Sequence, residues 1–388
     1  LIPTGYEIAY DQFQLPIHAE KGTYKVSGPA LNTSTQGDEL IASSSKVNFV
    51  FNKKSGLVTS YKVDGTEYFK DGFGIQPNFW RAPNDNDYGN GAPKRLQVWK
   101  QSSKNFHVTD ASMTTENKVV SLKVTYLLAA GNLYVVTYKI YPSGAVNVNA
   151  TFTSTDMQAA ETEVSEATRM ATFTPGSGAA RKAASKLEVP RIGVRFRLPA
   201  KMNNVQYFGR GPEENYIDRN HGTLVGVYKT TADKMYFNYV RPQENGHHTD
   251  TRWIALSPDK GSGLAIVADS LVGFNALRNS IEDFDSEEAL PHPYQWNNFS
   301  PEEVANHDEQ AARNVLRRMH HVNDITPRDF VEVCVDMKQQ GVGGYDSWGA
   351  HPEPFHQIPA NREYNWGFTL VPVRSAGQAN EAAKYEYQ

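Results

Sequence analysis

Four segments of this sequence concentrate the carboxylates, amides, imidazoles and aromatic rings that could do chemistry. They are FWRAPNDNDYGNG (79–91), YFGRGPEENYIDRNHG (207–222), YVRPQENGHHTDTRW (239–253) and GVGGYDSWGAHPEP (341–354). Glycine, proline, asparagine and aspartate are typical of turns, so each segment is predicted to form a loop. Because binding residues often lie on loops, these four loops hold the candidates for a functional site.

The 341–354 loop carries a tryptophan, Trp348, on irregular backbone. Gly343 and Gly344 allow a sharp turn, and the side chains of Asp346 and Ser347 can bond the amides of their own loop. The indole has two possible roles. It can plug the end of a core, or it can face outward and stack on a flat apolar partner such as a sugar face. The loop pattern alone leaves both roles open.

The 79–91 loop offers several oxygen ligands, in Asp85, Asn86 and Asp87. A calcium site would use such oxygens, but the spacing of an EF-hand with its distal glutamate is absent. We therefore interpret these residues as Asx turns, in which the side chains bond nearby backbone. Arg81 is a candidate to hold a carboxylate or a sugar hydroxyl. Arg81, Asp85 and Asp87 are thus predicted to line a pocket or an interface.

The 207–222 loop contains two adjacent glutamates, Glu213 and Glu214. Adjacent side chains on extended backbone point apart, which argues against a catalytic pair built from these two. A charged network with Arg210 and Arg219 is the favoured interpretation. Glu214, Asn215 and Arg219 are retained as pocket or interface candidates.

The 239–253 loop adds Glu244, Asn245 and His247, which we also assign as pocket or interface candidates. His247 and His248 are adjacent, and adjacent histidines seldom bind one metal ion. No third ligand follows at a recognised spacing, so no metal site is predicted.

Short alternating runs of apolar and polar residues must position these loops. Alternation with a period of two predicts strands that are buried on one face, and a helical period is almost absent. So many one-faced strands favour a large antiparallel all-β sandwich over a parallel βαβ fold. The clearest runs are KVNFVFN (46–52), LVTSYKV (57–63), VVSLKVTYLL (119–128), LYVVTYKIY (133–141), AVNVNATFT (145–153), IGVRFRL (192–198), GSGLAIVAD (261–269), FVEVCVDMK (330–338) and NWGFTLVPV (365–373).

One segment, SPEEVANHDEQAARNVLRRM (300–319), favours a helix, with Ser300 as its cap and Pro301 at its first position. The single cysteine, Cys334, lies in an alternating run and is interpreted as a small buried hydrophobe rather than a nucleophile. With one cysteine, no internal disulfide and no cysteine-based metal site can form.

Composition excludes several classes of partner. The 388 residues include 39 Lys plus Arg and 43 Asp plus Glu, a formal net charge of −4 with both signs interspersed, so no nucleic-acid partner is predicted. No run approaches the about 18 apolar residues of a membrane helix, and the N-terminus lacks a signal-peptide layout. We expect a soluble protein of the cytoplasm or bacterial periplasm. The first residue is not Met and falls in an alternating stretch, so we expect a piece of a longer chain.

NFWRAPNDNDYG, GRGPEENYIDR, YVRPQENGHHTDTRW and GVGGYDSWG, in this order and spacing, resemble the C-terminal domain, or small chain, of glycoside hydrolase family 2 β-galactosidases. The resemblance covers about residues 47–372 and implies a galactose-mutarotase-like β-supersandwich. The opening YEIAYDQFQL is similar to the last strand of the immunoglobulin-like domain that precedes it in that family. The predicted divisions are that strand (1–16), a linker with one or two weak strands (17–44), the supersandwich domain (45–375) and a polar, frayed tail (376–388).

The resemblance also implies a function. Family 2 enzymes are retaining glycosidases that use two carboxylates about 5 Å apart. In the family both lie on an upstream (β/α)₈ barrel, so this chain is expected to hold no catalytic residue and to be inactive alone. A Trp at the position of Trp348 forms part of the wall of the sugar site in the family, with Asp346 and Ser347 shaping its loop.

Two alternatives stay open: a stand-alone carbohydrate-binding module, and an aldose 1-epimerase that uses His247 with Glu214 or Glu244 as acid and base. No cofactor is predicted in this chain. The resemblance implies Mg²⁺ and a monovalent cation on other domains of the full enzyme, contact with the barrel domain, a galactoside substrate and a homo-oligomer. The charged segment 292–330 departs from the family pattern.

Overall fold

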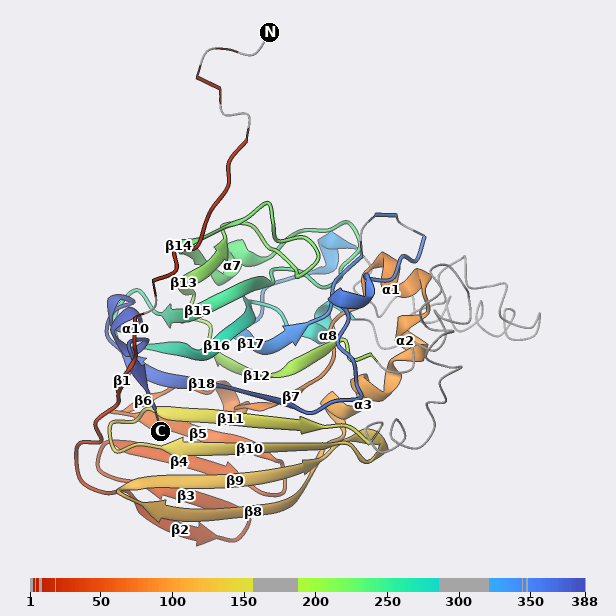
Figure 1. Cartoon of the computed structure of the whole chain (residues 1–388). Coiled ribbons are helices and arrows are strands. Elements are labelled where there is room, and N and C mark those ends of the chain that lie inside the picture. Colours follow the sequence, from red (N-terminus) through yellow and green to blue (C-terminus); the bar gives the residue numbers. More distant parts are fainter. Residues whose placement is uncertain are drawn as a thin grey trace.

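A computed structural model describes residues 3, 5–6, 9–17, 19–155, 188–285, 321–343, 345–346 and 348–387 (Figure 1). Strands dominate these residues, and the strand pairs described in the two larger sheets are antiparallel. The prediction of a large antiparallel all-β domain is confirmed. The predicted helix over 300–319 lies outside the described residues. The described residues include no helix that is long and apolar enough to cross a membrane.

A five-stranded sheet opens the domain, in the order β2-β3-β4-β5-β6. The turn between β5 and β6 has positive φ at Asp64 (47°) and Gly65 (80°), as a two-residue hairpin requires. β2 and β3 lie within the stretch predicted as a linker, and β3 pairs with β4. The strands are β2 (Asn32–Gln36), β3 (Glu39–Ser43), β4 (Val47–Asn52), β5 (Leu57–Val63) and β6 (Thr66–Glu67).

A twelve-stranded sheet forms the rest of the framework, along the path β14-β13-β15-β16-β18-β11-β10-β9-β8. Its longest strand, β16, pairs with β15 and β18, and the end of the same strand pairs with β17, which in turn pairs with β12. The strands are β7 (Gln76–Asn78), β8 (His107–Glu116), β9 (Val119–Leu127), β10 (Leu133–Ile140), β11 (Val146–Thr153), β12 (Arg191–Pro199), β13 (Asn204–Gly211), β14 (Leu224–Thr231), β15 (His248–Ser257), β16 (Gly263–Leu277), β17 (Phe330–Gln339) and β18 (Tyr364–Val373).

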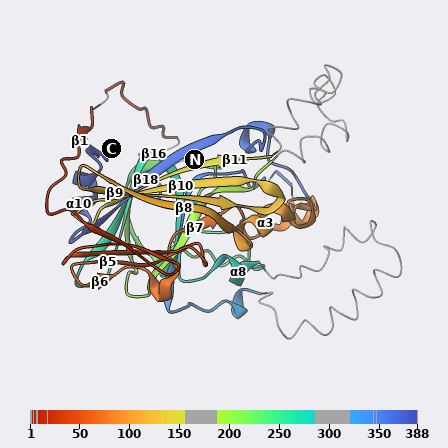
Figure 2. The same ribbon diagram turned by 90° about the horizontal axis from the view of Figure 1, so that it is seen from below.

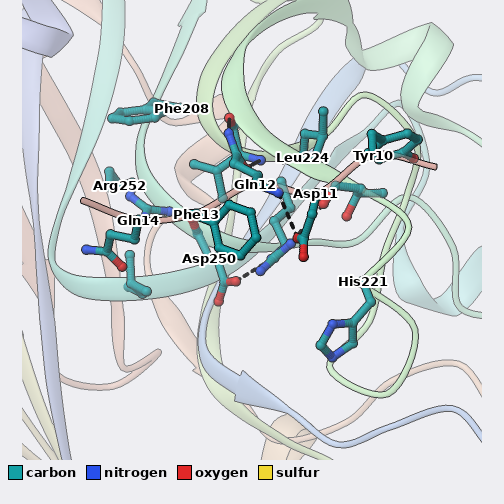
Figure 3. A pocket seen from close by; sticks show the side chains of 14 residues that line it. Tyr10, Asp11, Gln12, Phe13, Gln14, Phe208, His221, Leu224, Asp250 and Arg252 are labelled. Atoms are coloured by element: carbon teal, nitrogen blue, oxygen red, sulfur yellow. Dashed lines mark hydrogen bonds and ion pairs between the residues drawn. The ribbon is translucent and has the colours of Figure 1, made fainter. Parts of the chain in front are cut away.

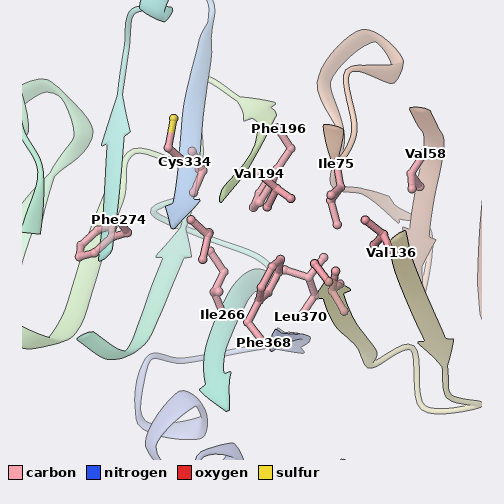
Figure 4. Packing of buried hydrophobic residues seen from close by; sticks show 14 of the residues in the cluster. Val58, Ile75, Val136, Val194, Phe196, Ile266, Phe274, Cys334, Phe368 and Leu370 are labelled. Atoms are coloured by element: carbon pink, nitrogen blue, oxygen red, sulfur yellow. The ribbon is translucent and has the colours of Figure 1, made fainter. Parts of the chain in front are cut away.

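The inward faces of both sheets form one core (Figure 4). Val58 of the five-stranded sheet and Val136 of the larger sheet are both buried in it, together with Phe196 and Phe368. Cys334 is also buried in this core, which confirms its prediction as a small hydrophobe, and burial raises the pKa of its thiol. The period-two alternation therefore does place the apolar side chains on the core face.

The described helices are short, and α1, α2 and α3 lie together at one end of the large sheet (Figure 1). Seen from below, α3 and α8 lie toward the same side of the molecule (Figure 2). The α-helices are α1 (Asp85–Gly89), α2 (Ala92–Arg95), α3 (Gln97–Lys104), α7 (Ala232–Met235), α8 (Ile281–Phe284) and α10 (Gly377–Ala382), and the 3₁₀ helices are Lys70–Gly72, Ala129–Gly131, Val322–Asp324 and Pro354–His356.

The C-terminal tail differs from the frayed tail that was predicted. It contains α10, whose Ala379 and Ala382 are buried in a cluster with Trp253. It ends in β19 (Tyr385–Glu386), which pairs in parallel with β1 (Gly22–Thr23). Ala379 and Ala382, three residues apart, form the buried face of this helix. The rest of the tail is mostly polar, which is why the sequence predicted a frayed segment.

Candidate functional site

The four predicted loops contact one another near α1 (Figure 1). Arg81 of the 79–91 loop donates to Gln340 O (2.7 Å) and Gly341 O (3.0 Å), at the start of the 341–354 loop. Gly343 N donates to Asp218 Oδ2 of the 207–222 loop (2.8 Å). Asn215 N in turn donates to His247 O of the 239–253 loop (2.7 Å). The fold therefore assembles the four loops into one cluster.

Arg81 is 2% exposed, and its guanidinium also contacts Asp87 through Nε (3.2 Å) and Nη2 (3.0 Å). The carboxylate that Arg81 holds is thus one from its own loop. Its Nη1 and Nη2 groups also bond the carbonyls of Gln340 and Gly341, where the 341–354 loop begins. A buried ion pair of this kind needs all its hydrogen bonds, because an unpaired buried charge is costly. Arg81 and Asp87 therefore act as an internal clamp between two loops.

The predicted Asx pattern appears as a capping box at the start of α1. Asn84 Oδ1 accepts from Asp87 N (2.8 Å), and Asp87 Oδ2 accepts from Asn84 N (3.1 Å). Asn84 Nδ2 reaches Val342 O (3.0 Å), and Asn86 Oδ1 accepts from Gly349 N (3.3 Å). Asp85, by contrast, points toward Arg241, with Nη1 at 3.4 Å from its Oδ1. α1 thus presents amide side chains to both ends of the 341–354 loop.

Trp348 is 68% exposed, so its indole does not plug the domain's own core. Asp346 Oδ1 accepts from Trp348 N (3.0 Å) and from Ala350 N (3.1 Å), which folds the backbone tightly around the indole. Gly343 has a φ of 70°, as the predicted sharp turn requires. Ser347 and Gly344 lie outside the described residues. The loop holds a large aromatic ring on the outer surface of the protein.

Glu214 lies at the centre of a polar network that joins the 207–222 and 239–253 loops. Its carboxylate accepts from Gly246 N (2.6 Å), from Arg219 and from the hydroxyl of Tyr239. Burial raises the pKa of Tyr239 to about 12, and the nearby carboxylate adds to that rise. Arg219 belongs to this network as predicted, whereas Arg210 pairs with Asp250 instead (2.5 Å).

Asn215 is fully buried, and its Oδ1 accepts from Thr249 N (2.9 Å) and Thr249 Oγ1 (2.6 Å). Asn245 is also buried, and its Oδ1 accepts from Phe237 N (3.2 Å). These two candidates bond the protein's own loops. Asn245 also lines a small hollow of about 10 Å³ beside Glu244 and Asn275.

Glu244 and His247 are buried beneath the loops, beside two residues that we did not predict, Arg191 and Asp336. Arg191 Nη2 lies 3.5 Å from Glu244 Oε1, and Arg191 Nε lies 3.2 Å from Asp336 Oδ2. His247 Nδ1 lies 3.7 Å from the same Asp336 oxygen. One feature of the sequence could have revealed Asp336: it is a charged residue at an inward position of the alternating strand FVEVCVDMK.

Burial dominates the protonation of this group, which we call the Asp336 cluster (Arg191, Glu244, His247 and Asp336). It lowers the pKa of His247 well below its ordinary value, so the imidazole is neutral near pH 7. It raises the pKa of Glu244 and raises that of Asp336 to about 7, with the positive charge of Arg191 opposing both rises. A sugar cannot reach these groups directly, because each is at most 6% exposed.

A separate hollow of about 650 Å³ lies between the N-terminal residues 10–14 and the β13–β16 region (Figure 3). Gln12 occupies one side, where its amide bonds Val225 N (2.7 Å) and Val225 O (2.8 Å). Arg210, His221 and Asp250 line the opposite side. None of the predicted candidates for the sugar site lines this hollow. The hollow marks where the N-terminal arm meets the edge strand β14.

Several carboxylates of the loop cluster are engaged within the protein. Among the described residues, the carboxylates of Asp87, Glu214 and Asp218 are bonded to neighbouring loop groups. No group of three or more potential metal ligands is present in the described parts of the chain. The rings of Trp348 and Tyr345 are each 68% exposed.

Comparison with known proteins gives a consistent match. Residues 43–370 match the family model described as the β-galactosidase small chain. A β-galactosidase of Priestia megaterium is 31% identical over 95% of this chain and 30% of its own length. A β-galactosidase of Streptococcus thermophilus is 25% identical over 96% of this chain and 30% of its own length. The chain thus spans about a third of the length of these relatives.

The fold is also similar to solved structures of two Lactobacillus acidophilus proteins. One is a galactose mutarotase related enzyme, with a TM-score of 0.41, 9% identity, and coverage of 87% of this chain and 98% of that chain. The other is a galactose 1-epimerase, with a TM-score of 0.41, 8% identity, and coverage of 89% of this chain and 98% of that chain.

Proposed function

This chain belongs to the β-galactosidase small-chain family, and we propose that it is the C-terminal module of a family 2 glycoside hydrolase. The enzyme would hydrolyse terminal β-D-galactosides with retention of configuration. The catalytic glutamates, and any Mg²⁺ or monovalent cation, would lie on parts of that enzyme outside this chain. This module would supply part of the wall of the substrate site and pack against a barrel domain of the same homo-oligomeric enzyme.

The observation that carries the proposal is the outward Trp348 on a firmly held loop. The indole is 68% exposed although four loops converge to fix the backbone beneath it. An exposed aromatic ring on a fixed loop is suited to stack on the apolar face of a sugar. Stacking and water exclusion position a substrate without any proton transfer by this chain. Asp346 and Ser347 would contribute by shaping the loop.

Hydrolysis of a chromogenic β-galactoside by the isolated chain and by the full-length enzyme tests the division of labour. The isolated chain is expected to give no turnover above buffer, because the family resemblance places both catalytic carboxylates on another domain, and Asp87, Glu214 and Asp218 are bonded within the loops. The full-length enzyme is expected to hydrolyse the substrate. Turnover by the isolated chain at a rate comparable with that of the full enzyme would show that this chain carries the catalytic groups.

A stand-alone carbohydrate-binding module is a second candidate, favoured by the joint exposure of Trp348 and Tyr345. It requires millimolar or tighter binding of galactose to the isolated chain, seen as a change in tryptophan fluorescence that Trp348→Ala abolishes. Absence of such binding leaves the first proposal intact. The epimerase alternative requires an acid and a base that a sugar can reach, but His247 is 1% and Glu244 is 6% exposed.

A further inference from the structure

We infer that Asp218 and Asn86 are positioning residues that set the Trp348 indole at the substrate site, an inference that rests on the proposed function. Neither residue was among the predicted site residues. They come from two different loops, and each holds one side of the backbone that carries Trp348. The two residues would act through the indole and would not touch the substrate.

Asp218 fixes the N-terminal side of the Trp348 turn. Its Oδ2 accepts from Gly343 N at 2.8 Å, in the residue that turns the chain with a φ of 70°. The carboxylate reaches this position because Gly341 has no side chain: a Cβ there would lie 2.5 Å from Asp218 Oδ2. The close approach of Asp218 to the 341–354 loop therefore depends on both loops. The 207–222 loop supplies the acceptor, and the missing side chain at Gly341 supplies the space.

Asn86 fixes the C-terminal side of the same turn. Its Oδ1 accepts from Gly349 N at 3.3 Å, directly after Trp348. Asn86 is only 8% exposed and lies in α1, whose first turn is closed by the Asn84–Asp87 capping box. The helix itself is tied to the start of the 341–354 loop by Arg81 and Asn84. The acceptor at Gly349 thus comes from a rigid element.

The five residues between these two anchors, 344–348, include the indole. Anchoring both sides lowers the conformational entropy that a flexible loop would lose when Trp348 stacks on a ligand. Asp346 adds a bond from within the loop, to Trp348 N and Ala350 N. Loss of either outer anchor should therefore weaken substrate binding while leaving the bond-breaking groups, on another part of the enzyme, unchanged.

A double-mutant cycle in the full-length enzyme tests this, with KM and kcat for a chromogenic β-galactoside as readouts. The variants are Asp218→Ala, Trp348→Ala and the pair together. Trp348→Ala is expected to raise KM by roughly 5- to 100-fold, as for loss of a stacked aromatic contact. Asp218→Ala is expected to raise KM about threefold or more with kcat nearly constant, and to change KM by less than about twofold once Trp348 is absent.

Two further variants guard against a purely structural explanation. Asp218→Asn retains an acceptor oxygen and is expected to restore most of the wild-type KM. Glu213→Ala removes a carboxylate from an exposed position of the same loop and is expected to leave KM unchanged. If Asp218→Ala does not fold, Asn86→Ala gives the same cycle from the other anchor.

The outcomes separate the two proposals. Two outcomes overturn the positioning role alone. One is an Asp218→Ala effect on KM that is equal in the presence and absence of Trp348. The other is an unchanged KM for both anchor variants while Trp348→Ala is impaired. An unchanged KM and kcat for Trp348→Ala overturns the proposed function and the positioning role together. A KM increase that depends on Trp348 supports both.

Discussion

Arg81 shows how much of a residue's role can be predicted from its type when its bonding partners are unknown. The sequence predicts an arginine that holds a carboxylate or a sugar hydroxyl, and the structure shows that carboxylate to be Asp87 of the same loop. With its other donors on Gln340 O and Gly341 O, the guanidinium is an internal clamp rather than a free ligand. Its contribution should therefore appear in stability.

Replacing Arg81 with Gln is expected to lower the free energy of unfolding by about 3–5 kcal/mol, because Asp87 is left as an unpaired buried charge. Urea unfolding followed by circular dichroism measures this loss. Arg241→Gln is the matched control: Arg241 is partly exposed and its pair with Asp85 is at the surface, so its loss is expected to stay below about 1 kcal/mol. Equal losses in the two variants would contradict the clamp.

Like Arg81, several of the predicted candidates are buried by contacts with other loops. Asn215, Asn245 and His247 are polar residues in turn-rich segments, which makes them look available. Their burial depends on other loops that are distant in sequence, and local composition does not encode those contacts. Among the sugar-site predictions, Trp348 and Asp346 are exposed, and the role of Trp348 as a substrate wall stays a proposal.

At the level of strands, the Asp336 cluster depends on the register of the sheet. Asp336 of β17 lies opposite Gly193 of β12 on one side and Gly273 of β16 on the other. A Cβ at Gly193 would lie 2.1 Å from Asp336 Oδ1, and one at Gly273 would lie 2.6 Å from the His247 ring. These two glycines, one in β12 and one in β16, thus make the space for a buried carboxylate and imidazole.

Gly193→Ala is accordingly expected to destabilise the fold, by about 1–3 kcal/mol or more, because the added methyl group overpacks the Asp336 carboxylate. Thermal or urea unfolding provides the measurement. Gly222→Ala serves as control, since a Cβ there has no atom within 4 Å and its stability is expected to change little. A Gly193→Ala protein as stable as the wild type would show that the strands shift freely at this position.

The protonation of Asp336 predicts a pH dependence of stability. Its pKa is about 7 in the folded chain against an ordinary 3.8, so the folded state binds more protons between these values. The contribution of Asp336 to the free energy of unfolding therefore falls as pH rises from about 4 to 7, and is constant above that range. His247 and His248 have lowered pKa values and contribute the opposite slope as pH approaches 6.5 from below.

Comparison with Asp336→Asn isolates the carboxylate from the histidines. The free energy of unfolding of the wild type minus that of the variant is expected to decrease between pH 5 and pH 7 and then to level. Urea unfolding at pH 5, 6, 7 and 8 measures this difference. A difference that is independent of pH would mean that Asp336 is ionised throughout, as a carboxylate fully compensated by Arg191 would be.

The alternation of apolar and polar residues predicted most of the strands, because a strand that is buried on one face has an apolar residue at every second position. KVNFVFN, LVTSYKV and LYVVTYKIY all form strands in which alternate residues, such as Phe49, Tyr61 and Val136, lie in the core. The short exposed strand β2, five residues without a buried side chain, has no such trace and was assigned to a linker. α10 was not predicted, because the residues that it packs against the large sheet are small alanines in a polar segment.

For the molecule as a whole, strands separated by long stretches of sequence bring four loops to one place, and the rings of Trp348 and Tyr345 face outward there. The match to the β-galactosidase small-chain family over residues 43–370 gives that surface its context. The chain covers about 30% of its relatives' length. We propose that the module contributes to a site that other parts of a longer enzyme complete.

The most direct measurement is the steady-state kinetics of Trp348→Ala in the full-length enzyme, with Trp348→Phe as the variant that keeps a stacking face. We predict a loss of roughly 1–3 kcal/mol in kcat/KM for the alanine variant, mainly through KM, and a smaller loss for phenylalanine. Wild-type kcat and KM in the alanine variant would contradict the claim that this chain lends an aromatic wall to the galactoside site.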